Sequence, residues 1–229
     1  MSGKQTNIKR TSTPYLALFD LDRTIFSVNS GNYLVWHAFR KNLISVLSLI
    51  KGIYLAFLYR TGWRETKKIL NEMTSWIKGI SETELNLIAE ELIKRKLLQK
   101  IRPQIYKEVE KHRHKGAHVV ILSAALPVLC HPIAFHLKMD DVICSKLESY
   151  QGIFTGKPLG MICYGEEKLK RLISYCRSNN FNIAESYYYA DSISDIHVLS
   201  SVGYPICIDP DRKLRNTAKK NNWLIPDWQ

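Results

Sequence analysis

Four short apolar runs, each followed at once by a polar residue, restrict most strongly how this chain can fold. The runs occupy residues 15–19, 117–122, 186–190 and 204–208. The polar residues that follow them are Asp20, Ser123, Asp191 and Asp209. An uninterrupted apolar run of this length is typical of a strand buried on both faces, as in a parallel sheet covered by helices. Such sheets carry their chemistry at the strand ends, so these polar residues are candidates for a functional site.

Helical patterns separate the apolar runs. Pro103 is placed to begin one helix and Gly116 to end it. Further helices are expected at residues 166–176, 195–202 and 211–220. Strands that alternate with helices through short connections predict an α/β fold, with a Rossmann-like, doubly wound parallel sheet.

Residues 29–102 carry no convincing strand signal and have helical patterns instead. Ser81 to Glu84 match a capping box in front of apolar residues at helical spacing. Residues 64–77 predict another helix, with Gly79 just past its end. We therefore expect an inserted all-helical cap domain.

The length of 229 residues suffices for one large domain or for a core domain with a smaller insertion. We expect the core at residues 14–28 and 103–229 and the helical cap at residues 29–102. Residues 1–13 are polar and basic, without the apolar region of a secretory signal, and predict a flexible tail.

The chain is basic, with 33 Lys and Arg against 21 Asp and Glu and a formal net charge of +12. This charge fits nucleic acid, an anionic membrane surface or small anionic substrates. The basic residues are spread along the chain and do not interleave with aromatic residues on one face, so we expect no nucleic-acid partner. A basic nucleic-acid-binding protein is the non-enzymatic alternative. The five cysteines form no CxxC pair and predict reduced thiols in a cytoplasmic protein.

Residues 43–59 form an apolar stretch of 17 residues that Lys51 and Gly52 interrupt. A membrane-spanning helix needs about 20 apolar residues, so we expect a buried or interface-lying helix instead. It either packs against other cap helices or contacts lipid. The basic residues around it, which suit contact with an anionic membrane surface, are Lys41, Lys51, Arg60, Arg64, Lys67 and Lys68.

Carboxylates gather after two of the predicted strands. Asp20 and Asp22 are two residues apart, so a strand would direct both side chains to the same face. Two adjacent carboxylates repel each other unless a cation lies beside them. Asp191 and Asp195 add two more, on a loop that enters a helix. Oxygen-rich clusters of this kind suit Mg²⁺.

Two further residues have the chemistry to bind an anion. Ser123 follows a predicted strand and precedes a predicted helix start, where a hydroxyl and free N–H groups can bind phosphate. Lys168 lies in the first turn of a predicted helix, where the helix dipole disfavours a cation. Taken singly, a helix cap, a turn or a solvated lysine would explain each of these residues equally well.

In order and spacing, these segments resemble the haloacid-dehalogenase-like phosphohydrolase superfamily over nearly the whole chain. Its DxDxT motif matches the segment from Asp20 to Thr24, and its second motif matches Ser123. The third motif matches Lys168, and the fourth matches residues 191–195. The helical insertion resembles the cap of the phosphoserine-phosphatase-like branch, subfamily IB. Arg23 stands where many relatives have Gly or Ser, and we expect it to act on the cap side of the site.

The resemblance implies a role for each matched residue. Asp20 would attack phosphorus and form an aspartyl-phosphate, while Asp22 would act as general acid and base. Mg²⁺ would bind the Asp20 carboxylate, the Asp22 carbonyl and the Asp191 carboxylate. The residues expected to bind the phosphoryl group are Ser123, Ala124 and Lys168. The residues expected to support the site are Thr24, Ser192 and Asp195, the last by orienting Lys168 or a metal-bound water.

The implied activity is Mg²⁺-dependent hydrolysis of a small organic phosphomonoester. Phosphoserine phosphatases are expected to bind the substrate's ammonium group through a Glu after the first motif and its carboxylate through a cap Arg. Residues 27–32 contain no acid and residues 69–73 no Arg, so phosphoserine is doubtful as the substrate. Alternatives are a phosphatidylglycerophosphate-type lipid phosphatase at the inner face of the membrane, a phosphotransferase, and a receiver-like signalling domain. The oligomeric state stays open.

Overall fold

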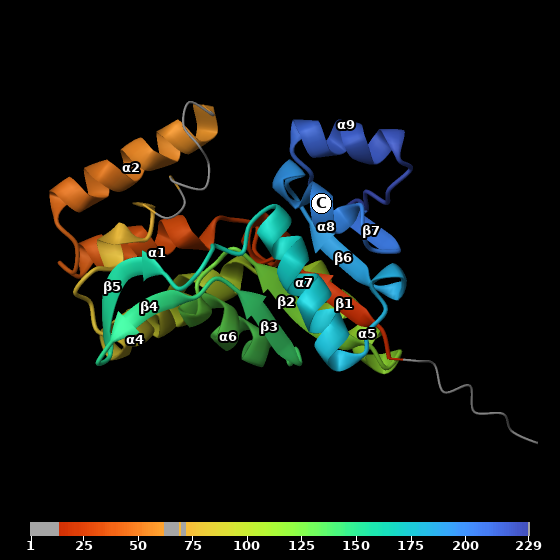
Figure 1. The fold of residues 1–229 in the computed structure, drawn as a ribbon, viewed down its shortest axis with the longest axis horizontal. Coiled ribbons are helices and arrows are strands. Elements are labelled where there is room, and N and C mark those ends of the chain that lie inside the picture. The colour runs from red at the N-terminus through yellow and green to blue at the C-terminus, as the bar shows by residue number, and fades with distance from the viewer. Residues whose placement is uncertain (1–13, 62–68, 70–71, 229) are drawn as a thin grey trace, which may run out of the picture.

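The computed structural model describes residues 14–61, 69 and 72–228. At its centre is a five-stranded sheet in the order β3-β2-β1-β6-β7, with every neighbouring pair parallel (Figure 1). Its strands are β1 (Leu16–Phe19), β2 (His118–Ser123), β3 (Asp141–Cys144), β6 (Tyr187–Ala190) and β7 (Tyr204–Cys207). All four apolar runs are thus strands, and the α/β fold with a doubly wound parallel sheet is confirmed.

Helices cover both faces of this sheet. They are α5 (Pro103–His114) and α6 (Pro127–His136) on one face, and α7 (Glu166–Asn179), α8 (Ile196–Leu199) and α9 (Arg212–Lys220) on the other. Alternate residues of β1 point to opposite sides. Ala17 and Phe19 belong to one buried apolar cluster, and Leu16 and Leu18 to the other. Burial on both faces therefore explains why this strand is apolar at every position.

Three strands were not predicted from the sequence. β3 is an edge strand of four residues that begins at the exposed Asp141, so it has no long apolar run. β4 (Leu147–Tyr150) and β5 (Ile153–Pro158) form an antiparallel hairpin outside the main sheet. Side chains of the hairpin are largely exposed or only partly buried, so the apolar signal of a core strand is missing there.

The helices differ from their predicted bounds in three places. α6 begins at Pro127, so three loop residues separate it from Ser123, where the sequence predicted an immediate helix start. α7 continues to Asn179 and ends at the left-handed Asn180. α8 covers four residues instead of the eight of the predicted segment. α5 ends as expected, with Gly116 just beyond it at a φ of 77°.

The described residues of the insertion between β1 and α5 are mainly helical, joined by turns. The insertion contains α1 (Ser30–Arg40), α2 (Val46–Thr61), α4 (Glu82–Leu92) and the short turns η2 (Ser75–Ile77), η3 (Ile93–Leu97) and η4 (Leu98–Lys100). Ser81 caps α4 by accepting a hydrogen bond from Glu84 N at 3.1 Å, as the capping box predicted. Half of the helix expected at residues 64–77 lies outside the described residues, and its last part is a turn followed by η2 instead of a continuous α-helix.

The insertion leaves and rejoins the core at one place. Phe26 and Ile101 form an antiparallel bridge, and Ser27 N donates a hydrogen bond to Lys100 O at 2.8 Å. The β4–β5 hairpin packs against the insertion from the other half of the chain, because Gly79 N donates to Phe154 O at 2.9 Å. The division into core, cap and tail stays a prediction, and residues 1–13 lie outside the described part. In that part, every helix is too short or too polar to cross a membrane.

Candidate active site

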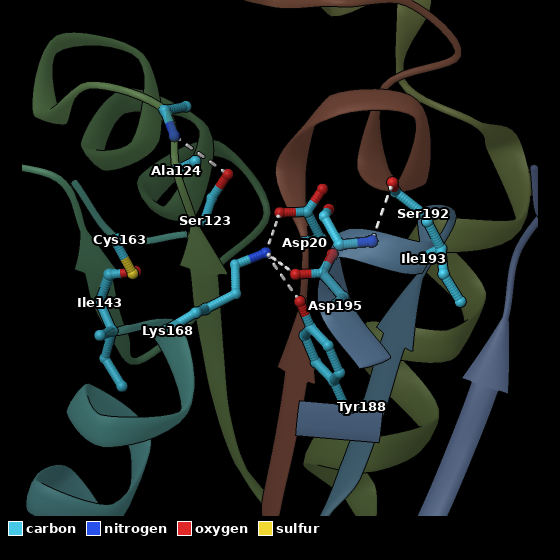
Figure 2. A network of polar contacts seen from close by, with 12 residues as sticks. Asp20, Ser123, Ala124, Ile143, Cys163, Lys168, Tyr188, Ser192, Ile193 and Asp195 are labelled. Carbon is cyan, nitrogen blue, oxygen red and sulfur yellow. Dashed lines mark hydrogen bonds and ion pairs between the residues drawn. The ribbon is translucent and has the colours of Figure 1, made fainter. Parts of the chain in front are cut away.

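The candidate site lies where three neighbouring strands end. Asp20 follows β1, Ser123 is the last residue of β2 and Asp191 follows β6. β1 lies between β2 and β6, and the strand order reverses there, which is where open α/β sheets bind their ligands. Figure 2 shows Asp20 at the centre, with Ser123 on one side and Ser192 on the other. The structure thus brings the first, second and fourth motifs to one edge of the sheet.

The ammonium group of Lys168 joins the third motif to this edge (Figure 2). Lys168 is the third residue of α7 and is only 3% exposed. Its Nζ donates hydrogen bonds to Asp195 Oδ1 at 2.7 Å, to Asp20 Oδ1 at 2.9 Å and to the Tyr188 hydroxyl at 2.9 Å. Burial favours the neutral amine, but the Asp195 and Asp20 carboxylates outweigh it and raise the pKa of Lys168 well above its ordinary value. Lys168 is therefore a buried cation shared by two carboxylates.

Asp22 lies on a tight turn and not on a strand. β1 ends at Phe19, and residues 21–25 form the turn η1 (Leu21–Ile25). The prediction that a strand directs Asp20 and Asp22 to the same face is therefore wrong. Asp22 Oδ1 accepts a hydrogen bond from Ser30 N, at the start of α1, at 2.7 Å. Burial raises the pKa of Asp22 to about 6, against the opposing effect of that hydrogen bond. Such a carboxyl group can gain and lose a proton near neutral pH.

Asp211, which was not predicted from the sequence as a site residue, holds the loop of the fourth motif. Asp211 N donates to Asp191 O at 2.8 Å, and Asp211 Oδ2 accepts from Ile193 N at 2.8 Å. Asp211 Oδ1 also caps α9 by accepting from Leu214 N at 2.9 Å. The start of α9 was predicted from the sequence. The contact between Asp211 Oδ2 and Ile193 N joins residues that are 18 positions apart, so no local pattern indicates it.

Three carboxyl groups, those of Asp20, Asp191 and Asp195, are buried at the site. Burial, followed by the nearby Asp20 and Asp195 carboxylates, raises the pKa of Asp191 to about 8. Lys168 is the one buried Lys or Arg among the described residues. A cation beside Asp20 and Asp191 would therefore relieve their repulsion, and their oxygen donors suit Mg²⁺.

The predicted ligand set needs two carboxylates and one backbone carbonyl. Within the described parts of the chain, no three His, Cys, Asp or Glu side chains are arranged to hold a metal ion. The expected set draws on only two side chains, those of Asp20 and Asp191, and on the Asp22 carbonyl, and all three are oxygen donors of the kind that Mg²⁺ prefers. The residues present therefore fit Mg²⁺.

The loop after β2 supplies the groups expected to bind phosphate. Ser123 is 2% exposed, and its Oγ accepts a hydrogen bond from Ala125 N at 3.3 Å. Ser145, which was not predicted from the sequence as a site residue, donates a hydrogen bond from its Oγ to Ala124 O at 2.7 Å. Ser145 directly follows β3, so overlooking that strand also hid this contact. The loop is thus held from two sides.

The two hydroxyl residues expected to support the site lie at its border. Thr24 Oγ1 is fully buried and has no hydrogen-bond partner among the described residues. Ser192 Oγ accepts a hydrogen bond from Ser194 N at 3.3 Å and so shapes the loop after β6. The contact of Ser192 is structural, and the role of Thr24 stays a prediction.

Comparison with known proteins points to one family. A family described as haloacid dehalogenase-like hydrolase matches residues 17–200. The chain is 27% identical to the inhibition of morphological differentiation protein of Streptomyces azureus over 217 residues, covering 93% of this chain and 78% of that protein. It is 25% identical to phosphoserine phosphatase SerB1 of Mycobacterium tuberculosis over 232 residues, covering 100% of this chain and 74% of that protein.

Solved structures share the fold. A Bordetella pertussis protein of unknown function matches with a TM-score of 0.88 at 25% identity, covering 95% of this chain and 100% of that one. A phospho-aspartyl intermediate analogue of phosphoserine phosphatase matches with a TM-score of 0.68 at 17% identity, covering 90% and 91% of the two chains. At that identity, the second likeness concerns the fold alone.

Proposed function

This chain belongs to the haloacid dehalogenase-like hydrolase family, and from that premise we propose that it is a phosphatase that hydrolyses phosphomonoesters through a phosphorylated Asp20. The observation that carries the proposal is the position of Asp20 at the end of the central strand. There it contacts Lys168 and is flanked by strand ends that carry Ser123 and Asp191. This arrangement supports the assignment of Asp20 as nucleophile, with Lys168 and the loop after β2 as the groups that bind the phosphoryl oxygens.

Asp20 is the nucleophile in this proposal. Lys168 Nζ holds Asp20 Oδ1 at 2.9 Å, so we assign the attack on phosphorus to Oδ2. The attack forms the aspartyl-phosphate as the bond between phosphorus and the leaving oxygen breaks, which divides one slow hydrolysis into two faster steps. Lys168 and Ser123 Oγ, with the Ala124 N–H, would bind the phosphoryl oxygens and stabilise their charge in the transition state.

Asp22 is the general acid and base. Its carboxyl group would give its proton to the leaving alkoxide and then accept one from the water that hydrolyses the aspartyl-phosphate. A pKa of about 6 suits both steps, since neither protonation state is strongly disfavoured near neutral pH. Ser30 N fixes the carboxylate through Oδ1, while Asp195 holds Lys168 in place and acts as a positioning residue.

Asp20, the Asp22 carbonyl and Asp191 would hold Mg²⁺. When bound, the ion offsets the repulsion between the anionic nucleophile and the anionic substrate. The oxygen donors, and the burial of three carboxyl groups beside a single buried lysine among the described residues, support this part of the proposal.

The proposed substrate is a small organic phosphate. Asn29 is one of the residues after the first motif, and its Oδ1 accepts a hydrogen bond from Asn32 N at 3.0 Å as the cap of α1. No carboxylate is present at residues 27–32 to pair with an ammonium group. Phosphoserine is therefore not the preferred substrate in this proposal, although one relative bears that name.

The first test is hydrolysis of an aryl phosphate with and without Mg²⁺. We expect stoichiometric release of inorganic phosphate, loss of activity with a chelator, and no activity for Asp20→Asn. Asp140→Asn, which changes an exposed aspartate, is the matched control. Phosphate release by the Asp20→Asn protein, or transfer of the phosphoryl group to an acceptor alcohol without release, would contradict the proposal.

A lipid phosphate at a membrane surface is the second candidate, because α2 has an apolar face that no described residue covers. Figure 1 shows α2 at the periphery, away from the sheet. Its exposed apolar and aromatic residues, with exposed fractions from 56% to 79%, are Val46, Leu47, Ile50, Ile53 and Tyr54. Leu49 and Leu55 on the same helix are buried. The net charge of +12 favours an anionic lipid surface over a second, equally basic copy of the chain.

Flotation with anionic vesicles tests this second candidate. Membrane contact predicts flotation with phosphatidylglycerol vesicles at low salt, and loss of flotation for Ile50→Glu. Leu87→Glu, at a 62% exposed residue of α4, should still float with the vesicles. Absence of flotation, or equal flotation of all three proteins, would exclude α2 as a lipid-binding surface.

A further inference from the structure

Arg23 has an unusual backbone for its residue type. It lies between Asp22 and Thr24 with φ 60° and ψ −6°, in the left-handed region. Side chains with a Cβ are disfavoured there, whereas glycine adopts the region freely. A residue of this kind persists only where its surroundings hold it, and such residues concentrate at functional sites.

The surroundings hold this backbone from two sides. Arg23 N donates a hydrogen bond to Val28 O at 3.1 Å, and Arg102 Nη2 donates one to Arg23 O at 3.2 Å. The same Arg102 Nη2 lies 3.4 Å from Asp209 Oδ2, so Arg102 links the turn to the end of β7. These contacts fix the backbone of Arg23 and would serve a glycine equally well. They do not explain why an arginine stands here.

The side chain of Arg23 is exposed and free to bind a ligand. Among the described residues, no hydrogen bond or ion pair engages its guanidinium group. Arg23 directly follows Asp22 on the turn that leads away from Asp20, so this residue borders the proposed site. An unpaired cation therefore stands beside the reacting carboxylates.

We propose that Arg23 binds a second anionic group of the substrate, a carboxylate or another phosphate, next to the phosphoryl group that is transferred. This proposal rests on the proposed phosphatase function. The planar guanidinium group can donate two parallel hydrogen bonds to either anion, which gives geometric selection as well as charge. Residues 27–32 contain no acid to pair with an ammonium group, so the second anion is the feature of the substrate that this inference concerns.

Matched substrates test the proposal. 3-Phosphoglycerate has a carboxylate where glycerol 3-phosphate has a hydroxymethyl group, and the two are otherwise alike. Propanediol bisphosphate differs from propanediol monophosphate only in the second phosphate. The wild-type protein should prefer the two-anion member of at least one pair in kcat/KM. Arg23→Gly should lower that preference about tenfold or more, mainly through KM, since hydrogen bonds to charged groups are typically this strong. The pair that responds identifies the anion.

Calorimetric titration of the Asp20→Asn protein with the same compounds needs no turnover and separates this inference from the proposed function. Tighter binding of a two-anion compound that is lost in Asp20→Asn/Arg23→Gly supports the role of Arg23 even if no hydrolysis occurs. Equal affinity of the paired compounds would overturn the inference. An equal loss for every compound would also overturn it, because Arg23 would then bind the common phosphoryl group.

Lys138→Gly is the control for the backbone. Lys138 is another exposed basic residue with a positive φ, 54°, and it lies just after α6. Both glycine variants should keep a Tm at or above that of the wild type, because glycine relaxes the left-handed backbone. Only Arg23→Gly should change the preference between paired substrates. A clearly lower Tm for Arg23→Gly would assign the arginine to the fold and contradict the inference.

Discussion

Lys168 Nζ lies 2.7 Å from Asp195 Oδ1, and both side chains are almost fully buried. The two residues come from different helical segments, 27 positions apart, and they meet beside Asp20. Because a buried carboxylate needs a partner, this pair links the stability of the protein to its proposed chemistry. Asp195 thereby holds Lys168 in contact with Asp20, the proposed nucleophile.

Lys168→Met should destabilise the protein strongly. The variant leaves the Asp20 and Asp195 carboxylates buried without their cation, and breaking a buried ion pair costs roughly 3–5 kcal/mol. Urea unfolding at neutral pH measures this loss. Lys170→Met, at an exposed residue of the same helix, is the control and should have little effect. Equal stability of both variants would show that the pair contributes nothing.

The rate should depend on pH through Asp22. Its pKa of about 6 means that the protonated carboxyl is lost as the pH rises above that value. Hydrolysis of an alkyl phosphate, whose leaving group needs a proton, should therefore decline in kcat/KM above this pH. Hydrolysis of an aryl phosphate with a good leaving group should decline much less. Identical pH profiles for the two substrates would contradict the role of Asp22 as general acid.

Mg²⁺ should stabilise the protein most at alkaline pH. The pKa of Asp191 is raised from 3.8 to about 8, so the folded state binds more protons than the unfolded state between these values. Without metal, stability should therefore fall as the pH rises through this window. Thermal unfolding at pH 8 with Mg²⁺ and with a chelator measures the effect. Asp191→Asn should lower both the pH dependence and the gain from Mg²⁺, and an unchanged gain would exclude Asp191 as a ligand.

A buried histidine should make the fold sensitive to acid. His112 Nε2 lies 2.8 Å from the Tyr189 hydroxyl, and burial lowers the pKa of His112 from 6.5 to about 4. The unfolded state then binds more protons than the folded state between these values, so stability falls as the pH drops through the window. His112→Gln should have a lower stability at neutral pH but a weaker decline in acid. If the stability of His112→Gln declines in acid as steeply as that of the wild type, groups other than His112 cause the decline.

The sequence predicts the centre of the fold and the positions of the motifs because both are local. Burial on two faces makes β1 apolar throughout. The capping box from Ser81 to Glu84 is a short local signal, and it predicts the start of α4. Asp20, Ser123 and Asp191 could be placed together because parallel strands end at one edge of a sheet. The sequence pattern was therefore sufficient to predict which residues meet at the site.

Contacts between distant segments could not be predicted in this way. The Tyr188 hydroxyl meets Lys168 across 20 residues, and Ser145 reaches Ala124 across 21. β3 escaped prediction because its edge position leaves Asp141 exposed. The left-handed turn at Arg23 was hidden because an arginine carries no local signal for a positive φ. The geometry of the site therefore depends on contacts that no local pattern specifies.

The most direct test of the account is to find where the phosphoryl group resides during turnover. We would quench the Asp22→Asn protein with acid during reaction with an aryl phosphate and locate the added phosphoryl group by peptide mass spectrometry. Because Asp22 would activate the water of the second step, this variant should accumulate the intermediate, with the phosphoryl group on Asp20. Phosphorylation of another residue, or hydrolysis that continues in the Asp20→Asn protein without any phosphorylated residue, would contradict the account.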